Sequence, residues 1–245
     1  MRGDEYEVNA TRCDGECMIT STHTPAVFVR TLGAFQVVRD GTPVPRAVWQ
    51  SKKARDLLKI LIARRKATSR EQLVSVLWPG VSPAKGGNRL SMLLSTLRNV
   101  LQPHTNVGPL ASDGNVVWLD RNQINVDVEK FLTGAGVALF AHRSGQPDAP
   151  ERLMTALAAY TGDFLEDDAT QDWAISLVEE VRATHIALLR AMAARLRQTG
   201  DFDEATRYLL RLLGQDPFDE RARLDLVNIR LEAGHRGEAR RHYHI

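Results

Sequence analysis

The sequence has little cysteine, no long apolar run and no targeting signal. Its 245 residues include 2 cysteines, Cys13 and Cys17, which are too few for a disulfide framework, and no companion residues stand at zinc-ligand spacing. No stretch of 18 apolar residues occurs, which excludes a membrane-spanning helix. The acidic, polar start MRGDEYEVNATRCDGECM is unlike a signal peptide. We therefore expect a reduced, cytoplasmic protein of one large or two small domains, in which these cysteines are free thiols.

Catalytic motifs are missing as well. The patterns GxSxG, HExxH and GxxxxGK[ST] do not occur, so common hydrolase, zinc-peptidase and phosphate-loop signatures are absent. We interpret one acidic cluster as a solvated loop before a helix, because no general acid partner or apolar pocket is recognisable beside it. Its members are Asp163, Glu166, Asp167, Asp168 and Asp172. Three C-terminal histidines, His235, His242 and His244, lack further ligands at fixed spacing. We predict no enzyme, no metal and no cofactor.

The charge is unevenly distributed along the chain. The formal net charge is only +2, but residues 26–120 contain 14 basic and 5 acidic side chains, a balance of +9. Residues 1–25 carry −3 and residues 121–245 carry −4. A basic segment followed by an acidic one indicates two domains with different partners, of which the first partner is polyanionic. We expect a flexible leader at 1–25, because that stretch shows no apolar periodicity.

Residues 26–120 show the order of a winged helix-turn-helix. The stretch VFVRTLGAFQVV and the following TPVP predict short strands around an Asp40-Gly41 turn. SKKARDLLKILIARR then predicts an amphipathic helix whose lysines and arginines lie mostly off the apolar stripe. A second helix starts at one of two alternative caps, Thr68 with Glu71 or Ser69 with Gln72, and ends at Pro79-Gly80. An Asp113-Gly114-Asn115 turn between apolar runs predicts a terminal β-hairpin.

The third helix, NRLSMLLSTLRNVL, separates an apolar face from a polar one. At 100° per residue, Leu90, Leu94, Leu97 and Leu101 fall within about 60° of one another and predict a narrow core stripe. The opposite face contains no acidic residue. In winged helix proteins such a helix enters the major groove of DNA, and the hairpin contacts the backbone or the minor groove.

The second half predicts helices near 127–141, 148–160, 171–198, 202–213, 218–232 and from 236 onwards. A repeat is visible, because GDFDEATRYL at Gly200 aligns with GHRGEARRHY at Gly234 with a period of 34 residues. This is the period of tetratricopeptide repeats, and Ala205 and Ala239 are the small residues that let paired helices approach closely. We expect a mainly α protein with a small β component. The predicted domains are the winged helix at 26–120 and a tetratricopeptide-like helical domain at 121–245.

The ordered set of motifs resembles the SARP/AfsR-type bacterial transcriptional activators, with an OmpR-like winged helix and a bacterial transcriptional activation domain. The set runs LGAFQV, KKARDLLKILI, SREQLVSVLWPG, NRLSMLLSTLRNVL and the hairpin, followed by LAAYTGDFLEDDATQDWAISLVEEVR with Tyr160, Gly162 and Trp173. The resemblance covers about residues 27–245. It implies an activator that binds promoter direct repeats, as a homodimer on DNA, and recruits RNA polymerase. The ATPase module of larger members is missing, and the helical domain is expected to extend somewhat beyond Ile245.

If the protein is a winged helix activator, two groups of residues are expected to contact DNA, and the resemblance implies a contact with RNA polymerase. Phosphates would be neutralised by Lys52, Lys53, Arg65, Lys66, Ser69, Arg70 and Lys85. Bases would be read by Asn88, Arg89, Ser91, Ser95, Arg98 and Asn99. Asn115 is a separate candidate for contact with DNA from the wing. The loop at 78–87 between the second and third helices would touch polymerase through Trp78, Val81, Ser82 and Lys85.

The predicted function is therefore a sequence-specific DNA-binding transcriptional regulator in the nucleoid. The alternative is a protein-interaction adaptor that binds its partners through the helical repeats. An adaptor has no need of a +9 first half or of a third helix without acidic residues, whereas a DNA-binding protein needs both.

Overall fold

The computed structural model describes residues 27–102 and 108–243. Its first half is built on a sheet of strand order β3-β2-β1-β7. β1 (Val27–Arg30), β2 (Gln36–Arg39) and β3 (Thr42–Pro43) are antiparallel, and β7 (Ile124–Val126) is parallel to β1. The predicted strands are confirmed. The leader at 1–25, with Cys13 and Cys17, lies outside the described residues.

Three helices pack together after this sheet. A short 3-10 helix, η1 (Arg46–Trp49), precedes α1 (Lys52–Arg64), α2 (Arg70–Leu77) and α3 (Pro83–Leu101). Of the two alternative caps, the structure selects Ser69. Its hydroxyl accepts from the backbone N–H of Gln72, and the Gln72 side chain accepts from the backbone N–H of Ser69, both at 3.2 Å. This reciprocal capping box sets the start of α2.

The hairpin forms as the turn chemistry predicts. β5 (Leu110–Asp113) and β6 (Val116–Leu119) are antiparallel and close around Gly114, which has a positive φ of 51°. A third strand, β4 (Thr68–Ser69), pairs with β6, and this strand was missed from the sequence because two residues carry no periodicity. It joins the hairpin to the start of α2, so the wing is fixed to the helix-turn-helix.

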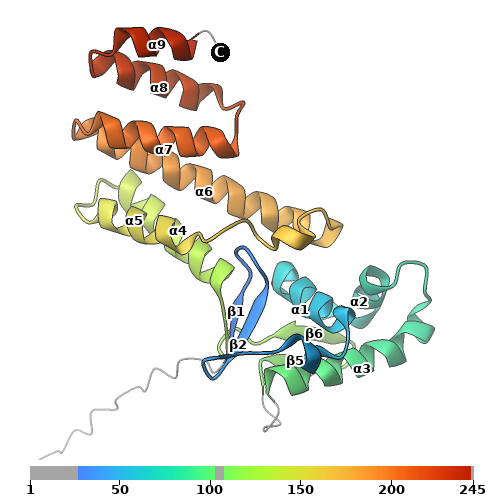
Figure 1. The fold of residues 1–245 in the computed structure, drawn as a ribbon. Coiled ribbons are helices and arrows are strands. Elements are labelled where there is room, and N and C mark those ends of the chain that lie inside the picture. Colours follow the sequence, from blue (N-terminus) through green and yellow to red (C-terminus); the bar gives the residue numbers. More distant parts are fainter. Residues whose placement is uncertain (1–26, 103–107, 244–245) are drawn as a thin grey trace, which may run out of the picture.

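The second half is a stack of helices (Figure 1). These are α4 (Asp127–Arg143), α5 (Ala149–Ala159), the short 3-10 helix η2 (Glu166–Asp168), α6 (Asp172–Gln198), α7 (Phe202–Gln215), α8 (Glu220–Glu232) and α9 (Arg236–Tyr243). The predicted helices are all present, and the mainly α fold class with a winged helix and a helical part is confirmed.

The 34-residue repeat has a clear structural counterpart. Gly200 and Gly234 precede α7 and α9 with φ of 81° and 80°, a left-handed conformation that glycine adopts without strain. Ala205 and Ala239 are both buried, at 0% and 2% exposure. Small buried residues at equivalent positions let each helix approach its neighbour, as the repeat period predicts.

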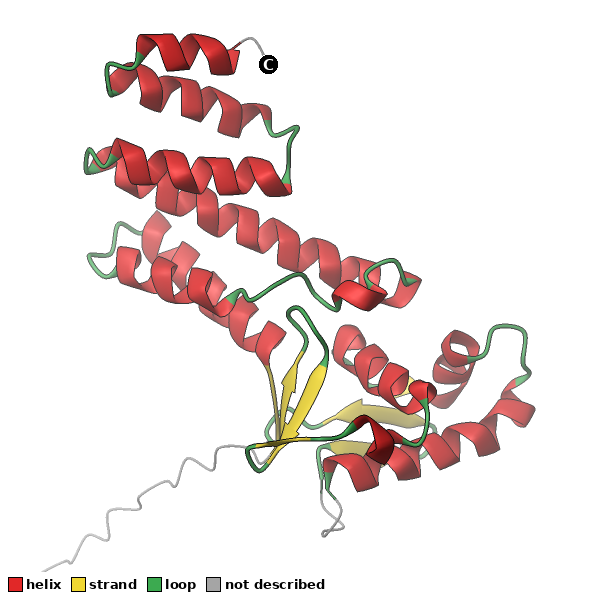
Figure 2. Cartoon of the chain, viewed as in Figure 1, coloured by secondary structure: helices red, strands yellow, loops and turns green. Residues whose placement is uncertain are grey.

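The two halves are joined by backbone as well as side-chain contacts. The Asp127 carboxylate at the start of α4 accepts hydrogen bonds from the backbone N–H groups of Thr31 and Leu32, at 2.7–3.0 Å. Leu32 also forms a β-bridge with Phe164. The sheet therefore lies at the junction of the two halves (Figure 2), and β7 joins it although it lies after residue 120. The proposed division into 26–120 and 121–245 stays a prediction.

Two expectations about charged residues were wrong. Lys59, expected off the apolar stripe of α1, is 7% exposed, and Asp168, expected in a solvated loop, is 8% exposed. The two form an ion pair between α1 and η2. The Lys59 ammonium also lies 4.8 Å from the centre of the Phe35 ring. Burial is possible for both because each supplies the opposite charge to the other.

Candidate nucleic-acid interface

The third helix has one buried and one exposed face. Leu90, Leu94, Leu97 and Leu101 are at most 1% exposed, so the predicted core stripe is confirmed. All six residues expected to read bases are exposed, namely Asn88, Arg89, Ser91, Ser95, Arg98 and Asn99. α3 lies at the end of the molecule opposite α9 (Figure 1), away from the helical stack. A long helix face is thus presented without an acidic residue of its own.

Two arginines on or beside this face are held by serine hydroxyls. Arg98 donates to the Ser112 hydroxyl in β5 at 3.0 Å, and Arg70 of α2 donates to the Ser91 hydroxyl in α3 at 2.6 Å. Ser91 in turn donates to the backbone oxygen of Gly87 at 3.0 Å. Neutral partners orient the guanidinium groups without cancelling their charge. Both guanidinium groups therefore remain available to an anionic or hydrogen-bonding ligand.

The third helix starts earlier than its leucine pattern suggests. Its N-cap is Ser82 and its first residue is Pro83, a residue favoured in the first turn because it has no N–H to leave unpaired. The expected loop at 78–87 is therefore only 78–82, and Lys85 belongs to α3 rather than to the loop. Trp78 and Val81 are half-buried and Ser82 is exposed. The spacing of apolar residues did not predict this start, because the first turn of α3 contains no leucine.

The expected phosphate contacts differ in how their charges are used. Lys52, Lys66 and Lys85 are exposed. Lys53 donates to the backbone oxygen of Leu77 at 2.6 Å and so covers the C-terminal end of α2. Arg65 forms an ion pair with Glu180 of α6 at 2.9 Å, so its charge is shared with the helical half of the protein.

The wing is tied to the start of α2 through its turn. Asn115 is exposed, and its backbone oxygen accepts a hydrogen bond from the Arg70 N–H at 2.8 Å. Ser69 pairs with Val116 in the strand register and is itself half-buried. The hairpin, the start of α2 and the exposed face of α3 therefore form one rigid surface.

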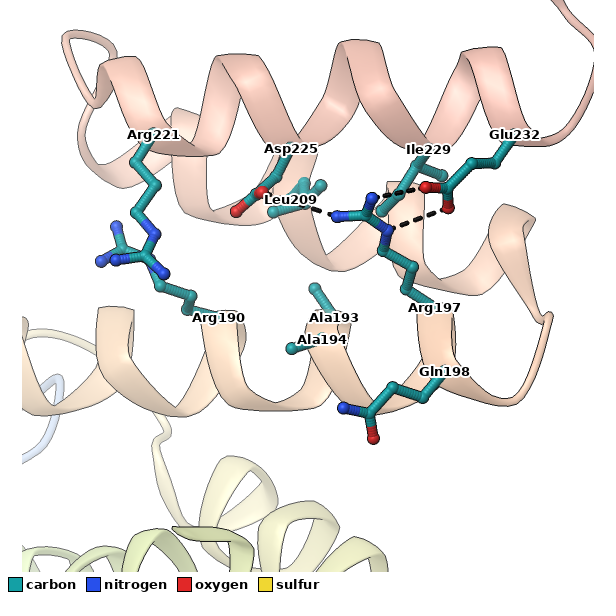
Figure 3. Close-up of a pocket in the computed structure, with 10 residues that line it drawn as sticks. All are labelled: Arg190, Ala193, Ala194, Arg197, Gln198, Leu209, Arg221, Asp225, Ile229 and Glu232. Atoms are coloured by element: carbon teal, nitrogen blue, oxygen red, sulfur yellow. Dashed lines mark hydrogen bonds and ion pairs between the residues drawn. The ribbon is translucent and has the colours of Figure 1, made fainter.

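The helical half contains a separate groove between α6 and α8 (Figure 3). Its cavity volume is about 450 Å³, and its polar lining is mainly charged. Arg197 of α6 contacts Glu232 at 2.9 Å and Asp225 at 3.8 Å, both in α8. Arg190 forms an ion pair with Asp219 at the N-cap of α8. Most of the charge in the groove is consequently neutralised within the protein.

Neither the acidic cluster nor the histidines form a site in the described part of the chain. The carboxylate of Asp168 forms an ion pair with the ammonium of Lys59, and Asp163 accepts a hydrogen bond from the Tyr160 hydroxyl. Burial of the Tyr160 hydroxyl and, to a smaller extent, this hydrogen bond raise the pKa of Tyr160 to about 12. No group of three His, Cys, Asp or Glu residues among the described residues is placed to hold a metal ion. His244 lies outside them, and nothing is described for the side chain of His242.

Comparison with known families identifies the second half of the chain. Residues 126–245 match the model of the bacterial transcriptional activator domain. This segment is a bacterial transcriptional activator domain. The match begins at the last residue of β7, where the chain leaves the sheet and enters α4. The resemblance to SARP/AfsR-type activators is thereby confirmed.

The fold that precedes the activator domain also has a counterpart among solved structures. The structure of Mycobacterium tuberculosis EmbR in complex with a low-affinity phosphopeptide superimposes with a TM-score of 0.72 at 23% sequence identity. The alignment covers 89% of the present chain and 58% of the EmbR chain, so it extends through the winged helix as well as the activator domain. No curated protein matches the chain. None of the helices in the described ranges is both long and apolar enough to cross a membrane.

Proposed function

We propose that the protein is a sequence-specific regulator of transcription that inserts α3 into the major groove of double-stranded DNA. The observation that carries this proposal is the exposed face of α3, which has no acidic residue and is flanked by the wing. An α-helix fits the width of the major groove, where each base pair presents a distinct pattern of donors and acceptors.

The residues divide into two roles. Arg89 and Arg98 present guanidinium forks suited to guanine O6 and N7, whereas Asn88 and Asn99 present amides suited to adenine. Ser91 and Ser95 suit short contacts to bases or phosphates. The other candidates serve the phosphates, namely Lys52, Lys53, Arg65, Lys66, Ser69, Arg70 and Lys85. Asn115 offers a separate contact from the wing.

The activator domain supports a positive role in transcription. In this proposal the protein binds direct repeats at a promoter as a homodimer and recruits RNA polymerase. The segment 78–82, with Trp78, Val81 and Ser82, lies between α2 and α3 and offers a polymerase contact beside the DNA. Lys85 follows in the first turn of α3, one turn from the same segment.

The proposal is tested by fluorescence anisotropy with duplexes selected from a random pool and with unselected duplexes, across a salt series. We expect the affinity to fall steeply with salt, because phosphate contacts release counterions. Arg98→Ala should weaken binding to the selected duplex about 5- to 100-fold, the cost of one lost bidentate base contact, and should leave binding to unselected duplexes nearly intact.

The matched control is Arg207→Ala in α7, an exposed arginine whose ion pair with Glu204 lies within the same helix. This variant should bind the selected duplex as the wild type does. If no duplex binds even at low salt, the DNA proposal fails and the adaptor alternative takes its place, with the α6–α8 groove as the first surface to test.

A further inference from the structure

One large apolar side chain stands in the middle of the polar face of α3. Met92 is 72% exposed, and among the large apolar residues of the described part only Phe218 is more exposed. Successive residues of a helix are rotated by 100°, so Asn88, Met92, Ser95 and Asn99 fall on one line along the helix. The leucine stripe of α3 lies on the opposite side. Met92 therefore contributes nothing to the core and points where the proposed DNA contact lies.

The neighbours of Met92 define what it can contact. Asn88 precedes it by one turn and Ser95 follows by one turn, and both are exposed polar residues. Nothing acidic lies on the helix to repel a nucleic acid. The methionine is thus a single apolar group within a row of hydrogen-bonding groups, on a surface that α2 and the wing hold in place.

We propose that Met92 recognises thymine by contacting its C5-methyl group in the major groove. The thymine methyl is the apolar group that the base edges present there, and a side chain detects it by excluding water from it. The flexible thioether of methionine can adapt its shape to that methyl. Asn88 and Asn99 on the same line suit adenine, so the row as a whole favours A·T pairs. This inference rests on the proposed insertion of α3 into the major groove.

The test removes the methyl group without changing base pairing. Each thymine of the selected duplex is replaced in turn by deoxyuridine, and the dissociation constants of the wild type and of Met92→Ala are measured by anisotropy at one salt concentration. For the wild type, we expect one or two of these replacements to weaken binding about 3- to 10-fold, as for loss of one buried methyl contact. Met92→Ala should lose a similar factor on the thymine duplex and should be insensitive to the same replacements.

Two further variants separate recognition from general effects. Met92→Leu keeps an apolar side chain and should retain the sensitivity to deoxyuridine. Met154→Ala removes a methionine that is 55% exposed in α5, far from α3 in the chain, and should bind both duplexes like the wild type. Circular dichroism should show the same helix content for all variants, because an exposed alanine favours the helix.

The inference is overturned if no thymine replacement changes wild-type affinity, or if Met92→Ala remains as sensitive to deoxyuridine as the wild type. In either case, a selected duplex whose binding still depends on Arg98 leaves the proposed function standing. If no duplex is bound at all, both the inference and the proposed function fail.

Discussion

At the scale of single residues, the ion pair of Lys59 and Asp168 joins the two halves of the protein. The two residues are 109 positions apart, yet they form a buried ion pair. Asp56 lies near the pair, and desolvation by burial raises its pKa while Lys59 opposes that rise. The pair connects the first helix of the winged helix to the loop before α6, so its loss should weaken the connection between the two halves.

Asp168→Asn should lower the free energy of unfolding by about 3 kcal/mol, because it leaves a buried ammonium group without its counter-charge. The matched control is Asp167→Asn, which neutralises the exposed neighbouring residue and should change stability by less than about 0.5 kcal/mol. Urea denaturation followed by circular dichroism measures both. Equal effects from the two variants would show that the ion pair contributes no more than a surface charge.

His185 should make the stability of the protein depend on pH. The ring is 3% exposed, stacks on Tyr160 at 3.7 Å between ring centres, and its Nδ1 lies 3.2 Å from Oε1 of Gln215. Its Nε2 has no hydrogen-bond partner among the described residues. Desolvation lowers the pKa of His185, assisted by Arg211 and opposed by the Gln215 hydrogen bond and by Asp163.

The direction in which stability changes with pH follows from the lowered pKa of His185 in the folded protein. Above the unfolded pKa of about 6.5 the ring is neutral in both states and its contribution is complete. As the pH falls from there towards the folded pKa, the unfolded chain binds a proton that the folded one does not, so stability is lost at up to about 1.4 kcal/mol per pH unit. His185→Gln should reduce the slope of stability against pH between 7.5 and 5, whereas His235→Gln, at an exposed position, should not. Unchanged slopes in both would exclude this histidine as the source.

At the scale of elements, the crossing of α2 and α3 depends on Gly86. A Cβ atom placed there would lie 2.2 Å from the Cγ1 of Val74, whereas one at Gly87 would meet nothing within 4 Å. Glycine at 86 therefore lets the two helices approach to the distance that positions the exposed face of α3. The same stretch was expected to be a loop, and glycine in a loop would have had no packing role.

Gly86→Ala should destabilise the protein by about 1–3 kcal/mol, because a branched valine offers little room for movement. Gly87→Ala should be neutral or stabilising by up to about 1 kcal/mol, since alanine favours a helix over glycine. Thermal unfolding measured by circular dichroism distinguishes them. If Gly86→Ala proved as stable as Gly87→Ala, the prediction would be wrong, because α2 and α3 could then move apart without loss of folding free energy.

At the scale of the whole molecule, the two halves should unfold as one unit. β7 carries the chain from the sheet directly into α4, and Asp127 at the start of α4 binds the backbone of Thr31 and Leu32 beyond β1. Contacts of this kind make the sheet a shared element rather than part of one half only.

We expect one thermal transition, with the same midpoint whether it is followed by far-ultraviolet circular dichroism or by tryptophan fluorescence. Asp127→Ala should lower both midpoints together, because it removes the acceptor of the N–H groups of Thr31 and Leu32 and leaves them unpaired. Two separated transitions in the wild type would contradict the shared sheet.

The exposed face of α3 could be predicted because the signal is local. Leu90, Leu94 and Leu97 share one side of a single helix, so their spacing alone places the polar residues outside. The start of the helix at Pro83 could not be found in this way, because its first turn has no large apolar residue to mark the core-facing side. The hydrogen bonds from Arg70 and Arg98 to serine hydroxyls of other elements could not be predicted either, since they join segments of the chain that only folding brings together.

Local patterns in the sequence were sufficient to predict the order of the α-helices and of the strands other than β4 and β7, the polar and apolar faces of α3, and the repeat at Gly200 and Gly234. Each of these depends on residues within one or two turns of each other or on a fixed period, where local geometry is sufficient. Three features became visible only in the folded protein: Lys59 and Asp168 are buried together, Gly86 packs against Val74, and β7 completes the first sheet. These features depend on pairs of segments far apart in the chain, and burial of charge or backbone there is favourable only once both partners are in place.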